Sequence, residues 1–233
     1  MRTRTVAILG CARDCAAHLP RALANVEHIA SLFEDHRFWA FENDSGDGTH
    51  RILQQFAARD PRRKLLSARF LTARMPGRTR RLAYVRQRLH AALQASGYRP
   101  DVVVVVDLDD AGAGSPVDLH RFLNGARSFA GWDAAFPRLS YDTAAWHPWP
   151  PRTDRATGLR ALAEAGARAV RVCSAFNGIG VYKGATYARG SYVPPGQALT
   201  GRHARPGPCE HVTFHASLGP GTRLAVLSGF AYP

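Results

Sequence analysis

The most restrictive feature of the sequence is a run of five valines, Val102 to Val106, followed at once by Asp107, Leu108, Asp109 and Asp110. Valine is stiff and favours extended chain, so the run predicts a β-strand. A strand with no polar position is buried on both faces, which is typical of the centre of a parallel sheet. The carboxylates that follow would repel one another without a cation or hydrogen-bond donors. The carboxyl end of a central strand is also where open α/β sheets bind ligands. The pattern favours a divalent metal site, and a solvated turn is the alternative.

Length and cysteine content limit the class of protein. The 233 residues are enough for one α/β domain with a smaller appendage. No stretch approaches the roughly 20 apolar residues of a membrane span. The first apolar run is interrupted by Arg13 and Asp14, which favours a first strand over a signal peptide. The cysteines have neither zinc-type spacing nor a disulfide pattern, so we expect a cytoplasmic protein; they are Cys11, Cys15, Cys173 and Cys209.

The net charge of +13 is carried mostly by arginine and is unevenly distributed. Residues 61–90 contain ten basic side chains and no acidic one. Such a segment attracts phosphate groups of a nucleotide, a nucleic acid or an anionic lipid surface. The alternative is a solvated basic face with no partner.

The order of the predicted elements indicates an α/β fold. Strands alternate with helices through residues 1–131, with strands expected near 5–10, 37–41, 64–71 and 102–106. This alternation predicts parallel strands and a nucleotide-binding half. Residues 132–233 form a second half with strands near 133–137, 171–183 and 224–227. Within this half we expect irregular chain over 146–151, a short alanine-rich helix within 152–170 and a mobile loop over 190–208.

Five segments, taken in order, resemble glycosyltransferases of the GT-A fold. Family-2-like members are the most similar, and capsule-associated mannosyltransferases share several of the elements. The segments are the first strand with Arg13, residues 42–49 (ENDSGDGT), residues 81–88 (RLAYVRQR), Asp107-Leu108-Asp109, and residues 174–180 (SAFNGIG). The resemblance implies one GT-A domain, with a Rossmann-like nucleotide-binding half on a mostly parallel central sheet and a smaller mixed acceptor-binding half.

The resemblance also implies roles for residues in the nucleotide half. Glu42 and Asn43 would hold the nucleoside, as acids and amides do at nucleotide sites; for Asn43 the alternative is a local Asx turn. Arg13 is placed with the nucleotide, and Arg81, then Arg78, would contact the diphosphate through a planar guanidinium.

Asp107-Leu108-Asp109 matches the DxD signature of metal-dependent transferases, which binds Mn²⁺ or Mg²⁺ together with the donor diphosphate. Asp109 is then the more direct metal ligand, and Asp107 contacts ribose or metal-bound water. Asn177 and Gly178 would line the sugar and acceptor pocket, or simply form a tight turn between strands.

The acceptor half departs from the family pattern at Glu210-His211, where related enzymes often carry adjacent acids. Glu210 is a candidate base for the acceptor hydroxyl, and His211 is the other candidate. His211 or His215 is also a candidate to complete the metal sphere. The identity of the base, and hence inverting or retaining stereochemistry, is open at this point.

The sequence therefore predicts a metal-dependent glycosyltransferase. It would move a hexose, with mannose favoured by the resemblance, from a GDP- or UDP-linked donor to a hydroxyl acceptor. The acceptor would be a glycan, a lipid-linked intermediate or a small molecule, and the basic face would meet an anionic glycan or the inner membrane surface.

A basic nucleic-acid-binding module is a weaker alternative, because it leaves the clustered acids unexplained and residues 61–90 contain few aromatics for base stacking. A nucleotidyltransferase on a similar sheet is another alternative, although no Gly-rich, Lys-bearing phosphate loop follows the first strand.

Overall fold

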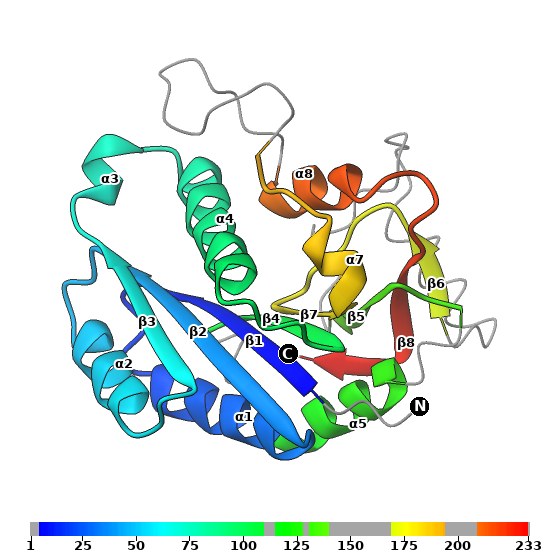
Figure 1. Cartoon of the computed structure of the whole chain (residues 1–233), viewed down its shortest axis with the longest axis horizontal. Helices are drawn as coiled ribbons and strands as arrows, with labels where there is room; N and C mark the ends of the chain where they lie inside the picture. Colours follow the sequence, from blue (N-terminus) through cyan, green and yellow to red (C-terminus); the bar gives the residue numbers. More distant parts are fainter. Residues whose placement is uncertain (1–4, 110–114, 128–130, 140–168, 194–208, 233) are drawn as a thin grey trace.

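The structure is a computed structural model that describes residues 5–109, 115–127, 131–139, 169–193 and 209–232. These residues form one eight-stranded sheet with the strand order β3-β2-β1-β4-β7-β5-β8-β6. Helices cover both faces of the sheet (Figure 1). The two halves of the sequence share this single sheet, with β4 of the first half paired to β7 of the second.

The first half is the predicted parallel unit. Its strands are β1 (Thr5–Ala12), β2 (Asp35–Asn43), β3 (Arg63–Ala68) and β4 (Val102–Asp107). They pair in parallel, with β1 between β2 and β4. The connecting helices are α1 (Leu19–Ser31), α2 (Thr49–Ala58), the short α3 (Leu71–Arg74) and α4 (Arg78–Ala95). Parallel strands require such crossover connections.

The second half is mixed. It contains β5 (Ala134–Leu139), β6 (Ala169–Val172), β7 (Ile179–Lys183) and β8 (Leu224–Tyr232), with helices α5 (Pro116–Arg127), α7 (Gly184–Ala188) and α8 (Glu210–Ser217). Strand β7 runs antiparallel to both β4 and β5, and β6 runs antiparallel to β8. The expectation of a mostly parallel sheet followed by a mixed half is confirmed.

The valine strand divides the core into two layers. Val102, Val104 and Val106 pack on the side of α1, α2 and α5, whereas Val103 and Val105 pack on the side of α4 and α8. All five valines are buried. This alternation follows from the two-residue period of a strand and confirms that β4 is covered on both faces. Figure 1 shows the two helical layers, with α4 and α8 on one face of the sheet and α1, α2 and α5 on the other.

Several expectations fall outside the described residues: the irregular segment 146–151, the alanine-rich helix within 152–170 and most of the loop over 190–208. Cys11, Cys15, Cys173 and Cys209, which all lie in the described part of the chain, form no disulfide. None of the described helices combines the length and apolar character needed to cross a bilayer.

Candidate active site

The carboxyl ends of β1 and β4 lie side by side at the position where the chain changes direction across the sheet. From β1 the chain continues to β2 and β3 on one side, and it returns to β4 on the other. Ligands of open α/β sheets bind in the crevice that such a reversal leaves at the carboxyl edge. The candidate residues after β1, β2 and β4 therefore meet at one edge of the sheet.

The acids after β4 are held by a tightly packed leucine. Leu108 is fully buried, in the layer of α1 and α5. Asp107 and Asp109, one residue on either side, are partly exposed. The Leu108 amide donates to the Cys11 carbonyl at 3.1 Å, and the Asp107 amide donates to the Gly178 carbonyl at 2.9 Å. The strand end is thereby tied both to β1 and to the turn before β7.

Asp107 lies in an environment that disfavours its charge. Burial raises its pKa to about 6, the Arg86 guanidinium opposes this increase, and the neighbouring Asp109 carboxylate adds to it. Asp109 is thus near enough for its charge to act on Asp107. Paired acids of this kind gain from a bound cation, which stabilises the charged form of both.

Arg86 joins the two halves of the site. Its side chain, only 2% exposed, donates from Nη2 to Asp107 Oδ1 at 2.6 Å and from Nε to Glu210 Oε1 at 3.2 Å. Its Cζ lies 4.7 Å from the centre of the Phe176 ring. This one guanidinium thus links β4, α4 and α8.

Arg86 was not singled out by the sequence analysis, which ranked Arg81 and Arg78 first. The signal was present: Arg86 follows Leu82 by four residues and precedes Leu89 by three, which places it within the apolar stripe of the helix. An arginine inside such a stripe is buried, and a buried charge requires partners of opposite sign.

The two candidate bases begin α8. Glu210 is buried, and its second oxygen, Oε2, lies 3.5 Å from Cys209 Sγ. The His211 ring stacks on Phe176 at a centroid distance of 3.8 Å. Burial lowers the pKa of His211 well below its usual value, and Arg86 and His215 add to this effect, so the imidazole is neutral. Neither His211 ring nitrogen has a hydrogen-bond partner within the described part of the chain.

The surroundings of His215 do not support the prediction that it completes a metal sphere. Its Nδ1 lies 2.8 Å from Ser174 Oγ and its Nε2 lies 2.9 Å from Tyr182 Oη, so both ring nitrogens are already hydrogen-bonded. Burial lowers the pKa of His215 to about 3, which keeps the ring neutral. We assign His215 to the packing of α8 against the sheet.

Glu42 and Asn43 end β2 and are buried. Glu42 Oε1 accepts from the Ser45 amide and its Oε2 pairs with His50 Nδ1, both at 2.9 Å. Asn43 donates to Asp44 at 3.3 Å. In the structure Glu42 braces the loop after β2, and Asn43 donates to the side chain of the next residue. Their contact with a nucleoside remains a prediction.

The loops after β1 and β2 are bonded to each other. Asp14 accepts from the Gly46 amide at 2.7 Å, and Asp47 accepts from the Ala16 amide at 2.9 Å. Arg13 lies 3.2 Å from Asp14, at the outer side of this connection. These bonds fix the two loops relative to the carboxyl edge of the sheet.

Arg81 and Arg78 open α4 near the same edge. Arg81 donates to the Met75 and Pro76 carbonyls at 2.8 and 2.6 Å. Burial lowers the pKa of Arg81, and the nearby charge of Arg13 contributes. Arg78 is exposed, and its charge also lowers the pKa of Arg81. The structure thus gathers Arg13, Arg78 and Arg81 into one positively charged group, which we call the arginine rim.

Asn177 and Gly178 form the turn before β7, both with positive φ, at 59° and 80°. Asn177 Nδ2 donates to the Pro137 carbonyl at 2.6 Å. Because the Gly178 carbonyl accepts from Asp107, this turn lies directly against the DxD segment. A left-handed asparagine is uncommon outside turns with a structural or functional requirement.

The donor atoms at the strand end fit a hard divalent cation. Carboxylate oxygens are the ligands that Mg²⁺ and Mn²⁺ prefer. The described residues include no cluster of three or more His, Cys, Asp or Glu side chains able to hold a metal by themselves. Mg²⁺ is often bound through one or two carboxylates together with substrate phosphates.

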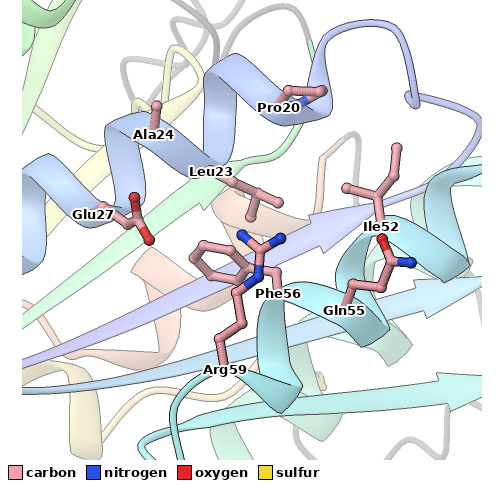
Figure 2. A pocket seen from close by; sticks show the side chains of 8 residues that line it. All are labelled: Pro20, Leu23, Ala24, Glu27, Ile52, Gln55, Phe56 and Arg59. Atoms are coloured by element: carbon pink, nitrogen blue, oxygen red, sulfur yellow. The ribbon is translucent and has the colours of Figure 1, made fainter.

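A separate hollow of about 270 Å³ lies between α1 and α2, on the other face of the sheet from α4 and α8. Figure 2 shows its lining: Pro20, Leu23, Ala24, Glu27, Ile52, Gln55, Phe56 and Arg59. It contains none of the residues predicted for the site.

Comparisons with known proteins give the following matches. No protein-family model matches the sequence, and no curated protein sequence matches it. Among solved structures, glucosyl-3-phosphoglycerate synthase of M. tuberculosis is similar over 84% of this chain and 62% of its own, with 14% identity and a TM-score of 0.47. The S. aureus TarS fragment 1-349 is similar over 98% of this chain and 59% of its own, with 13% identity and a TM-score of 0.49. Mannosyltransferase PcManGT from Pyrobaculum calidifontis, in complex with GDP-Man and Mn²⁺, is similar over 81% of this chain and 47% of its own, with 16% identity and a TM-score of 0.44. This chain therefore spans less than two thirds of each of these proteins.

Proposed function

We propose that this chain is a metal-dependent glycosyltransferase of the GT-A type that uses a nucleoside diphosphate sugar. The observation that carries the proposal is the position of Asp107 and Asp109. These acids lie at the end of the central strand, at the reversal of strand order, and Asp107 is linked through Arg86 to Glu210, a buried carboxylate of the other half. A solvated turn would leave both acids exposed and unpaired.

The donor binds along the carboxyl edge of the first half. Asp109, with Asp107 beside it, would hold Mn²⁺ or Mg²⁺. When bound, the cation offsets the charge that develops on the departing diphosphate. The arginine rim contacts the phosphate oxygens, for which a guanidinium is a suitable partner. The loop braced by Glu42 and Asn43 holds the nucleoside.

The acceptor hydroxyl enters from the second half, beside Asn177 and Gly178. Glu210 accepts its proton as the acceptor oxygen bonds to the anomeric carbon and the bond to the diphosphate breaks, with the electron pair leaving on the diphosphate. We assign Glu210 rather than His211 because the His211 imidazole is neutral and deeply buried, and neither of its nitrogens has a hydrogen bond among the described residues to orient its proton. The transferred group is a hexose, and GDP-mannose is the first donor to test because of the sequence resemblance to capsule-associated mannosyltransferases.

A group of exposed basic residues near the start of α4 is suited to contact with an anionic membrane. We call Arg69, Phe70, Arg74 and Arg78 the Phe70 patch. All four residues are exposed, and Phe70 is 70% exposed with φ of 61°. An exposed aromatic residue among arginines fits the interface of an anionic membrane that carries a lipid-linked acceptor. We propose peripheral binding of the chain to such a surface.

The test is a screen of UDP- and GDP-linked hexoses for release of the nucleoside diphosphate, with Mn²⁺ and with Mg²⁺. We expect release by the wild type with one donor class, loss of release in Asp109→Asn, and at least a hundredfold loss in Glu210→Gln. His211→Asn is the comparison for the base and should retain more activity than Glu210→Gln. Failure of every sugar nucleotide to bind or react in the presence of either metal would overturn the proposal.

A further inference from the structure

Arg86 occupies the position where the donor and acceptor halves of the site meet. Its partners, Asp107 and Glu210, are separated by 103 residues of sequence and come from β4 and from the first residue of α8. The guanidinium reaches both through different nitrogens, Nη2 and Nε. A planar fork of donors can satisfy two carboxylates at once in a fixed geometry, which a lysine ammonium cannot.

Burial makes this link sensitive to change. Arg86 and Glu210 are 2% and 7% exposed at their side chains. Removing one partner of a buried ion pair leaves an uncompensated charge, so the three groups depend on one another. Phe176, which lies against Arg86 on one side, stacks on His211 through its ring, so the guanidinium is also held from its face.

The link fixes one oxygen of Glu210 and leaves the other for chemistry. Oε1 accepts a hydrogen bond from Arg86, and among the described residues the partner of Oε2 is the thiol of Cys209 at 3.5 Å, a weak donor. A carboxylate held in this way cannot rotate freely and presents the same oxygen to an incoming group. General bases work well only when they are held in hydrogen-bonding reach of the proton that they accept.

We propose that Arg86 is a positioning residue, which holds the Glu210 carboxylate in its reactive orientation and anchors it to Asp107 of the donor site. This inference rests on the proposed function. It assigns to Arg86 a role that acts through Glu210, distinct from the direct phosphate contacts proposed for the arginine rim. Two of its guanidinium nitrogens already donate to the Asp107 and Glu210 carboxylates, and the third, Nη1, is buried.

The test is a double-mutant cycle on the transfer reaction. Arg86→Lys keeps the charge and is therefore the variant that should fold, and Arg86→Met is the more severe change. We expect Arg86→Lys to lower kcat by about 100-fold with less than about a threefold change in donor KM. In the Glu210→Gln background the same substitution should cost less than about threefold, because the group that it positions is already inactive. Arg88, exposed on the same helix two residues away, provides the matched control Arg88→Lys, which should leave kcat unchanged.

The outcomes separate a failure of the role inferred for Arg86 from a failure of the proposed glycosyltransferase function. If wild-type enzyme turns over a sugar nucleotide and Arg86→Lys costs the same factor in both backgrounds, Arg86 acts independently of Glu210 and the inference is wrong. A large rise in donor KM with unchanged kcat would make Arg86 a donor-binding residue and would also overturn it. Absence of turnover by the wild type would overturn the proposed function, and this inference with it.

Discussion

Leu108 packs directly over Gly10: a methyl group on the glycine Cα would lie 2.7 Å from both Cγ and Cδ1 of the leucine. Gly10 lies on β1 opposite Val106 of β4, one step before the paired residues Cys11 and Asp107. The absence of a side chain at Gly10 thus allows Leu108 to turn into the core between the two acids. The geometry of the DxD segment depends on a glycine almost 100 residues earlier.

Substitution of Gly10 should therefore weaken both the fold and the metal site. We expect Gly10→Ala to lower the free energy of unfolding by about 1–3 kcal/mol, the usual cost of overpacking a core. We also expect weaker Mn²⁺ binding, because displacement of Leu108 moves Asp107 and Asp109. Urea unfolding and Mn²⁺ titration by calorimetry measure the two effects. Gly221→Ala, at a glycine with open space around it, is the control and should change neither. Unchanged stability in Gly10→Ala would contradict the packing role.

Asp109 should carry the metal-dependent part of nucleotide binding. We expect UDP or GDP with Mn²⁺ to raise the melting temperature of the wild type, because a ligand that binds only the folded state stabilises it. Asp109→Asn should lose the increment that Mn²⁺ adds while keeping a similar melting temperature without ligand. Differential scanning fluorimetry with and without EDTA separates the two contributions.

The control for Asp109 is another aspartate at the surface. Asp118 lies on α5 and pairs only loosely with Arg121, at 3.9 Å. Asp118→Asn should retain the full Mn²⁺ increment. An equal loss in both variants would indicate a nonspecific charge effect rather than a site at the end of β4.

The fold was largely predictable because its signals are local. The valine run and the strand–helix alternation each depend on neighbouring residues, and they place β1 to β4 close to their observed bounds. The short helices α3 and α7 were missed, because four- and five-residue helices carry no full apolar period.

The site was predicted less completely because its contacts are between distant residues. The clustering of acids at Asp107 and Asp109 is visible in the sequence, whereas the bridge from Arg86 to Glu210 joins residues 124 apart. His215 has the helical spacing of a ligand next to His211, but only the fold reveals that Ser174 and Tyr182 occupy its nitrogens. Sequence spacing indicates which residues share a helix face and gives no information on the partner across that face.

Buried neutral histidines should make the fold sensitive to acid. Burial lowers the pKa of His215 to about 3, while an unfolded histidine titrates near pH 6.5. Below that value the unfolded chain takes up a proton that the folded chain refuses, so stability is present above pH 6.5 and falls as the pH is lowered. The expected slope is about 1.4 kcal/mol per pH unit for each such histidine.

Chemical unfolding at pH 7.5, 6.0 and 5.0 measures this dependence. His215→Gln should be less stable than the wild type at pH 7.5, because it loses good hydrogen bonds to Ser174 and Tyr182. It should nevertheless lose less stability between pH 6.0 and 5.0, since one titrating group has been removed. The remaining slope would come from the other histidines whose pKa is lowered by burial, which are His211, His90 and His36. A variant with the wild-type slope would show that His215 is already protonated in the folded state.

Phe70 combines exposure with a backbone conformation that is costly for a bulky residue. Its φ of 61° lies in the left-handed region, which costs about 1–2 kcal/mol for residues other than glycine. Phe70→Gly should therefore stabilise the folded chain in urea unfolding.

If the Phe70 patch meets an anionic membrane, the same variant should bind vesicles containing phosphatidylglycerol less tightly than the wild type. Arg74→Ala should weaken vesicle binding by about fivefold at low salt, given about 1 kcal/mol per arginine near such a surface. Arg21→Ala, an equal change of charge at an exposed position on α1, should have little effect. Co-sedimentation with neutral and anionic vesicles separates lipid charge from general adhesion. Equal binding by Phe70→Gly and the wild type, or equal losses in Arg74→Ala and Arg21→Ala, would show that the patch is not a membrane-binding surface.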